Sequence, residues 1–171
     1  MSEAQERYLA HQERKKKALL EIMLERHSER AFSELLPSFD DIAGFLSAME
    51  TCPSSCDRKG VSVRVVEGRD NKALLGGLLV GGVGWIHRAP AVLLLFGNKE
   101  SYKAEGEISY MPYLDAGAMM YAAYLHATAK GMACCFCNPN IREQNKAHFE
   151  AIFGEGVFCG AVAIGFPRKS S

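Results

Sequence analysis

Two arginines and a serine alternate in the segment that runs from residue 26 to residue 32, and their spacing suits an anionic ligand. If the backbone is extended there, Arg26, Ser28 and Arg30 point to one side, because successive side chains of an extended chain alternate. That side offers two cations and a hydroxyl donor, which suits a phosphate or a reduced flavin. A polar helix exit has the same composition, so this segment alone leaves both interpretations open.

A second polar segment, residues 51–59, reads Thr-Cys-Pro-Ser-Ser-Cys-Asp-Arg-Lys. Pro, Ser and Asp favour turns, and the run from Pro53 to Ser55 places hydroxyls and free backbone amides next to charged side chains. Taken alone the segment is a loop between a helix and a strand. It is a second candidate binding element, in addition to residues 26–32.

The remaining clusters of reactive residues fit known sites poorly. The cysteine groups Cys52-x3-Cys56 and Cys134-Cys135-x-Cys137 lack the paired C-x2-C spacing with which one turn offers two thiolates to a metal. We therefore expect reduced thiols and no metal site. The glycines of residues 81–84 lack the third glycine of G-x-G-x-x-G and follow an expected helix, so they are no dinucleotide fingerprint.

The composition describes one folded domain over residues 1–171. Hydrophobic residues make up 48% and charged residues 23%, which provides for a core and excludes a disordered module. Twenty basic residues balance twenty acidic ones, so the basic excess of a nucleic-acid binder is missing. The most apolar run, residues 73–86, is too short to span a bilayer, and the polar first twenty residues do not resemble a signal peptide. We expect a cytoplasmic protein that binds neither nucleic acid nor a membrane.

Hydrophobic periodicity and turn residues predict the elements that must position these groups. A long helix is expected over residues 3–26, and a second one follows Ser38, whose side chain can form a capping box with Asp41. The other expected elements are strands at 61–66, 91–96, 132–137 and 157–166 and helices at 71–80, 112–131 and 141–153, with a polar loop at 97–111. Helices around a four-strand sheet indicate an α+β or mixed α/β domain.

With these elements in order, the chain resembles the nitroreductase family of FMN-dependent oxidoreductases. Residues 26–32 fit the family pattern Arg-(Arg/His)-Ser-x-(Arg/Lys)-x-Phe, and Pro-Ser-Ser follows at the family's distance. Weaker similarities follow in order at Ala89-Pro90, Asp115-Ala116-Gly117, Lys130-Gly131-Met132 and Ile164-Gly165-Phe166-Pro167. The chain departs from the family pattern where Asp57 replaces an asparagine, where Lys59-Gly60 replace Gln-Pro, and at Gly82-Val83, near a position where the family often has asparagine.

The resemblance implies a nitroreductase-like α+β fold, with a central, mostly antiparallel sheet flanked by helices and a long N-terminal helix. It also implies a homodimer that holds FMN at the subunit interface, with residues 1–25 packing on the partner subunit. Arg26, Ser28, Arg168 and Lys169 would hold the phosphate, while Arg30 would lie near the pyrimidine end. The full set of FMN-binding residues that the resemblance implies is Arg26, His27, Ser28, Arg30, Pro53, Ser54, Ser55, Asp57, Phe136, Asn138, Arg168 and Lys169.

The implied reaction takes a hydride from NADH or NADPH to flavin N5 and passes the electrons to a small organic acceptor in a ping-pong sequence. No catalytic acid or base is implied, because the flavin carries the chemistry. Three alternatives to this reaction stay open. The first is a flavin-dependent dehydrogenase of a biosynthetic intermediate, and the second is a flavin-binding dimeric module without turnover. The third and most remote is a metal-thiolate protein.

Overall fold

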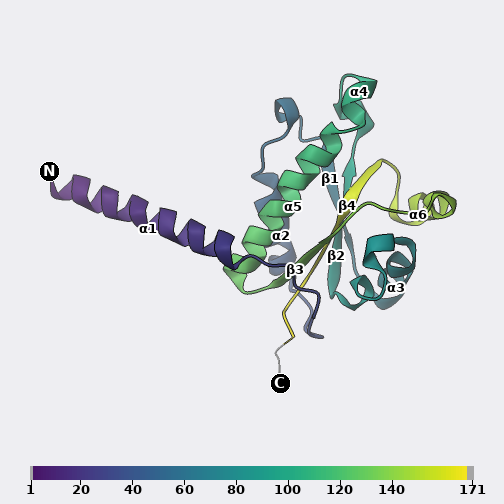
Figure 1. The fold of residues 1–171 in the computed structure, drawn as a ribbon, viewed down its shortest axis with the longest axis horizontal. Helices are drawn as coiled ribbons and strands as arrows, with labels where there is room; N and C mark the ends of the chain where they lie inside the picture. The colour runs from purple at the N-terminus through teal and green to yellow at the C-terminus, as the bar shows by residue number, and fades with distance from the viewer. Residues whose placement is uncertain (1, 169–171) are drawn as a thin grey trace.

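A computed structural model describes residues 2–168 as helices packed around one sheet, with a single helix standing apart (Figure 1). The helices are α1 (Glu3–Glu25), α2 (Phe39–Glu50), α3 (Arg69–Leu78), α4 (Glu105–Ile108), α5 (Met111–Lys130) and α6 (Lys146–Phe153). The strands are β1 (Val61–Val66), β2 (Ala91–Gly97), β3 (Ala133–Cys137) and β4 (Val157–Gly165). The elements alternate much as the periodicity predicts, and the fold is α+β.

The four strands form one antiparallel sheet in the order β1-β2-β4-β3. Every residue of β2 is buried, which confirms the central strand predicted from the continuous apolar run after Pro90. Successive residues of β2 face opposite layers of the core. Leu93 and Leu95 pack with α2 and α5, whereas Leu94 and Phe96 pack with α3 and α6. The sheet is therefore the middle layer of three, as Figure 1 shows.

Helix α5 packs on the sheet and contacts both candidate binding elements, through Tyr124 and Asp115, so its limits matter for the site. Pro112 lies in its first turn, where a missing N–H costs nothing, and Gly131 ends it in the left-handed conformation with φ of 64°. Both features were expected from the sequence. The predicted capping box of Ser38 and Asp41 is also present at the start of α2, where Ser38 Oγ accepts from the Asp41 amide.

Three predicted boundaries need correction. The helix expected at 141–153 begins only at Lys146, because Ile141 pairs with Leu79 in a β-bridge that holds the preceding chain extended. The helix expected at 71–80 occupies Arg69–Leu78, two residues earlier at each end. The polar loop at 97–111 contains the short helix α4. Only the first of these differences comes from a pairing between distant residues; the other two are local differences at the ends of elements and in a loop.

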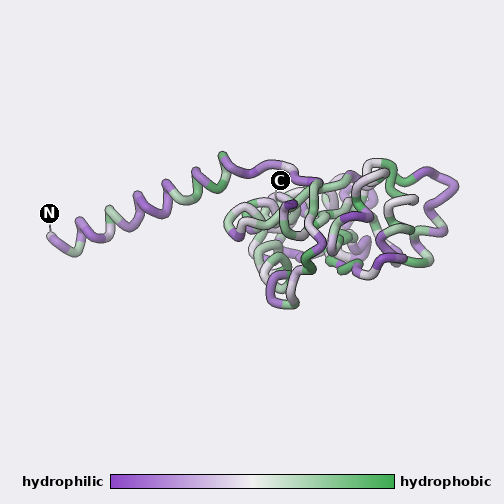
Figure 2. Tube along the Cα trace, turned by 90° about the horizontal axis from the view of Figure 1, so that it is seen from below, coloured by the Kyte–Doolittle hydropathy of each residue, from purple (hydrophilic) through white to green (hydrophobic). Residues whose placement is uncertain are grey.

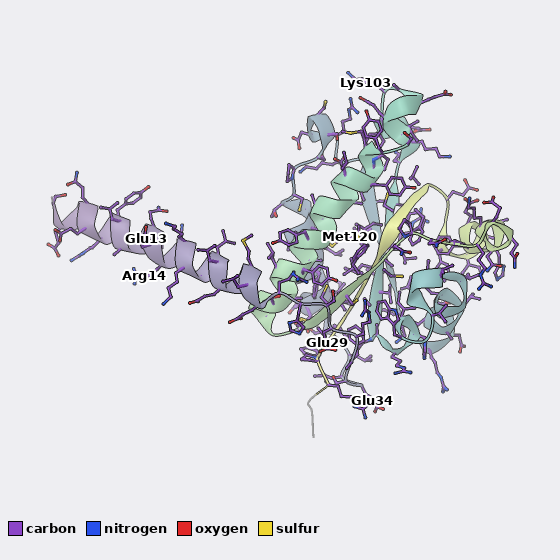
Figure 3. All side chains as sticks on the ribbon, viewed as in Figure 1. Glu13, Arg14, Glu29, Glu34, Lys103 and Met120 are labelled. Carbon is purple, nitrogen blue, oxygen red and sulfur yellow. The ribbon has the colours of Figure 1, made fainter. Side chains whose placement is uncertain are left out.

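Helix α1 projects from the body of the molecule (Figures 1 and 2). Over Glu3–Glu25 it buries no residue, and Leu24 is 84% exposed. Figure 3 shows side chains such as those of Glu13 and Arg14 standing clear of the sheet and its covering helices. The predicted helix is thus present, but its apolar residues find no cover within one chain. Among residues 2–168, no helix is long and apolar enough to cross a bilayer.

Candidate functional site

The segment of residues 26–32 directly follows α1 and docks along the edge strand β3. The Glu29 amide donates to the Cys134 carbonyl oxygen at 3.0 Å, and the Arg168 amide donates to the Ala31 carbonyl oxygen at 2.8 Å. Phe32 is buried in the core between these contacts. The segment is thereby fixed between β3 and the chain that leaves β4, which also brings Arg168 beside it.

A buried tyrosine of α5 connects this segment to strand β3. The Tyr124 hydroxyl lies 2.9 Å from Ser28 Oγ and accepts a hydrogen bond of 2.9 Å from the Phe136 amide. The guanidinium of Arg26 lies over the Tyr124 ring, 5.3 Å from its centroid. Burial raises the pKa of Tyr124, so its hydroxyl stays protonated. Arg26, Ser28 and the β3 backbone therefore share one support, which we call the Tyr124 cradle.

Arg30 lies against a second aromatic support at the end of β3. Its guanidinium is 5.3 Å from the centroid of the Trp85 ring, and Trp85 Nε1 donates to the Gly81 carbonyl oxygen at 2.8 Å. A Cβ at Gly81 would lie 3.1 Å from Asn138 Oδ1, so this loop packs closely against the end of the strand. Phe136, two residues before Asn138 in the chain, is 41% exposed. Arg30 and Asn138 thus lie around one glycine-rich loop.

The Pro-Ser-Ser segment is anchored elsewhere, at the start of α5. Asp115 is 7% exposed, and its Oδ1 accepts hydrogen bonds of 3.0 Å from both the amide and the hydroxyl of Ser55. Its Oδ2 accepts from the Tyr102 hydroxyl at 3.1 Å. Burial and the neighbouring carboxylate both raise the pKa of Tyr102. A buried carboxylate without a cation is stable only with such donors, and here they fix the loop to the helix.

The residues after Ser55 have a strained backbone. Cys56, Asp57 and Lys59 have φ values of 51°, 53° and 48°, which cost non-glycine residues about 1 kcal/mol or more each. The Lys59 amide donates to Ser54 Oγ, and Lys59 Nζ donates to the Cys52 carbonyl oxygen, both at 2.9 Å. Strain held in place by such contacts is typical of functional loops.

The charged side chains after Ser55 are paired, two with each other and one with a residue of α4. Lys59 Nζ lies 3.4 Å from the Asp57 carboxylate, so the acidic departure from the family pattern carries its own counter-ion. Arg58 instead turns inward and pairs with Glu107 at 3.0 Å. A cleft of about 450 Å³ lies beside the loop and is lined by Met49, Glu50, Cys52, Pro53, Ser54, Lys59, Val61, Asp115 and Met119.

The two candidate binding elements do not meet within one chain. Asp115 and Tyr124 lie on the same helix, about 13 Å apart along its axis and about half a turn apart around it, given 1.5 Å and 100° per residue. The Pro-Ser-Ser loop contacts the first residue and the Tyr124 cradle contains the second. The distance between the two candidate elements therefore follows from the positions of Asp115 and Tyr124 on one helix.

Comparison with known proteins identifies the fold. No family model matches the sequence, and no curated protein matches it. Among solved structures, a provisionally named NADH dehydrogenase/NAD(P)H nitroreductase of Parabacteroides distasonis is similar, with a TM-score of 0.77, 17% identity, and coverage of 90% of this chain and 89% of that one. A provisionally named nitroreductase of Desulfovibrio desulfuricans, solved in complex with FMN, has a TM-score of 0.75, 22% identity and coverage of 90% and 89%. An FMN-dependent nitroreductase of Clostridium difficile has a TM-score of 0.75, 18% identity and 88% coverage of both chains.

The chain has the nitroreductase fold. The fold predicted from the motifs is thereby confirmed, and its elements show where each predicted site residue lies. One group comprises Arg26, Ser28, Arg30, Phe136, Asn138 and Arg168; the other comprises Pro53, Ser54, Ser55 and Asp57. The His27 ring, exposed at the end of α1, lies 3.0 Å from the Glu25 carbonyl oxygen. Lys169 lies outside the described residues.

Sequence reasoning about this nitroreductase-fold chain missed three residues that support the site, namely Asp115, Tyr124 and Trp85. The sequence could have indicated the role of Asp115, because an acidic residue in an apolar, small-residue helix needs buried hydrogen-bond donors. Nothing in the sequence distinguishes Tyr124 and Trp85, since aromatic residues at helical spacing or near a turn are usually ordinary core residues.

All six cysteines are free thiols, as expected, and within residues 2–168 no group of three or more His, Cys, Asp or Glu is arranged to hold a metal. Burial raises the pKa of Cys137 and of Cys159 to about 11. At pH 8 these thiols are therefore protonated as well as buried, and the thiolate is the reactive form.

We therefore expect a disulfide reagent such as Ellman's reagent at pH 8 to modify the exposed Cys56 quickly and the half-buried Cys52 more slowly. The buried set, Cys134, Cys135, Cys137 and Cys159, should react only after unfolding in guanidinium. The absorbance of the released thiolate checks this count. Rapid reaction of all six cysteines in the native protein would contradict the packing of β3 and β4.

Proposed function

We propose that this chain is an FMN-dependent oxidoreductase in which each FMN lies between two copies of the chain. The observation that carries the proposal is the Tyr124 cradle, which fixes Arg26 and the Ser28 hydroxyl next to the exposed Phe136 of β3. The known proteins that share this fold include one solved with FMN and one named as FMN-dependent.

The donor set fits the two ends of FMN. Arg26 and the Ser28 hydroxyl provide a cation and a neutral donor for a phosphate dianion, and Arg168 adds a second cation from the chain after β4. Arg30, supported by Trp85, would place positive charge near the pyrimidine end of the ring. The exposed Phe136 and the close approach of Gly81 to Asn138 provide backbone and apolar surface for a flat ring. When bound, FMN supplies hydride transfer at N5, and the chain supplies binding, orientation and charge.

The second copy would complete the site. The Pro-Ser-Ser loop presents Ser54 and Pro53 at a cleft on the other side of α5, where one chain has no phosphate cradle. The outer face of α5 exposes Leu114 by 63% and Tyr121 by 43%, with the exposed Gly117 between them at helical spacing. Such an apolar stripe is typical of an interface. We propose that this face pairs with a second copy and that α1 packs on that partner.

Replacing both Leu114 and Tyr121 by arginine should therefore give a monomer. Four buried cations in a symmetric interface would repel one another and lack partners, and a site built from two chains would lose FMN affinity by about tenfold or more. Analytical ultracentrifugation and an FMN titration measure the two effects. Ile152→Arg, an equally apolar and 41% exposed position on α6, is the matched control. A double variant that stays dimeric would contradict the proposed interface.

The electron donor is proposed to be NADH or NADPH, in keeping with the names of several structural neighbours. The test is the absorbance spectrum of the protein with FMN, recorded anaerobically before and after each donor. Flavin bands near about 370 and 450 nm that bleach with either donor would support a reductase. Bound flavin that resists both donors would favour a substrate-driven dehydrogenase or a binding module. Absence of flavin binding would refute the proposal.

A further inference from the structure

The chemistry of the groups fixes the direction of one of the two hydrogen bonds around Tyr124, and the other bond joins two hydroxyls, each of which can donate. A backbone amide can only donate, so the Tyr124 oxygen accepts from the Phe136 amide. The phenolic proton is still available, and among the described residues Ser28 Oγ at 2.9 Å is the partner that would satisfy it. When the phenol donates to Ser28, the serine oxygen acts as acceptor and its own proton is available to point outward.

From this geometry we infer that Tyr124 is a positioning residue that makes the Ser28 hydroxyl a donor toward an anionic phosphate. The inference rests on the proposed function, because it concerns the phosphate of FMN. A phosphate oxygen accepts hydrogen bonds and has no proton to give when fully ionised. A serine already engaged as acceptor by Tyr124 has the matching polarity, whereas an unsupported hydroxyl can rotate to donate inward.

Two further observations support this role. Ser28 is exposed while Tyr124 is buried, so their hydrogen bond joins a buried phenol to a surface hydroxyl that a ligand can contact. The Arg26 guanidinium lies over the ring of the same tyrosine, which places a cation beside the serine donor. Burial keeps the phenol protonated at neutral pH, as the donor role requires.

The test compares FMN with riboflavin, which has the same ring system but no phosphate. Tyr124→Phe keeps the aromatic ring and removes only the hydroxyl. We expect it to weaken FMN binding about threefold to tenfold and to leave riboflavin binding unchanged, since one oriented hydrogen bond to a charged group is affected. Tyr113→Phe is the control, because the Tyr113 hydroxyl has no hydrogen-bond partner in the described part of the chain and lies outside the Tyr124 cradle.

Ser28→Ala provides the second variant, at an exposed position where folding tolerates the change. It should weaken FMN binding about tenfold or more, again without affecting riboflavin. In the Ser28→Ala background, Tyr124→Phe should add little further loss, because the tyrosine acts through the serine. Fluorescence titrations give all the dissociation constants, and far-UV circular dichroism checks the fold of each variant.

Several results would overturn the inference while leaving the proposed function intact. Tyr124→Phe could bind FMN as the wild type does, lose FMN and riboflavin equally, or add its full effect to that of Ser28→Ala. The second result would assign the tyrosine a merely structural role, and the third would show that it acts independently of Ser28. A wild-type protein that binds neither FMN nor riboflavin would instead overturn the proposed function and this inference with it.

Discussion

Replacement of Arg26 and Arg30 together by alanine is expected to abolish FMN retention. Each arginine is proposed to make charge-assisted contacts to FMN, and such contacts are typically worth about 1.5–3 kcal/mol. Together they would account for about 3–6 kcal/mol, which corresponds to a loss of affinity of about 100-fold to 10,000-fold. The FMN content after gel filtration, followed by a fluorescence titration, measures the loss.

The same double variant should keep its fold. The arginines lie over the Tyr124 and Trp85 rings near the surface, and contacts of this kind contribute about 0.5–1 kcal/mol each. Arg69→Ala with Arg142→Ala removes equal charge at two exposed positions and should leave FMN affinity unchanged. Unchanged FMN occupancy in the Arg26 and Arg30 variant would refute the assignment of the Tyr124 cradle.

Asp115→Ala is expected to have the largest effect on stability. The substitution removes the acceptor of the Ser55 amide, the Ser55 hydroxyl and the buried Tyr102 hydroxyl. A buried donor without a partner costs about 1–3 kcal/mol, and water can reach the Ser55 side, so we expect the free energy of unfolding to fall by about 2–4 kcal/mol. Urea denaturation followed by circular dichroism measures this change.

Two further variants separate the hydrogen bonds from the charge. Asp115→Asn keeps one oxygen acceptor for Ser55 and offers an amide to Tyr102, so its loss should be about half that of the alanine variant. Glu34→Ala removes an exposed carboxylate in a loop near the docked segment (Figure 3) and should change the free energy of unfolding by less than about 0.5 kcal/mol. Equal stability of Asp115→Ala and Glu34→Ala would show that the carboxylate does not anchor the loop.

Much of the fold follows from local signals in the sequence. The helix at 112–131 is bounded by a proline that suits its first turn and a glycine that suits a left-handed end, and both rules depend only on the residue itself. The strand at 91–96 is a continuous apolar run, as burial on both faces requires. The alternation of Arg26, Ser28 and Arg30 is also a local pattern, and the common side that it predicts for them stays a prediction.

The supports of these residues could not be read from the sequence, because they come from distant parts of the chain. Ser28 meets Tyr124, and Ser55 meets Asp115, only after α5 has packed on the sheet. Likewise, the pairing of Leu79 with Ile141 shortens the predicted last helix. The sequence alone therefore determined which residue types could hold an anion and which segments are helix or strand, since those properties are local. Only the tertiary structure decided which side chain supports which, and that the two binding elements lie on opposite sides of α5, because both depend on how the packed helix directs its residues.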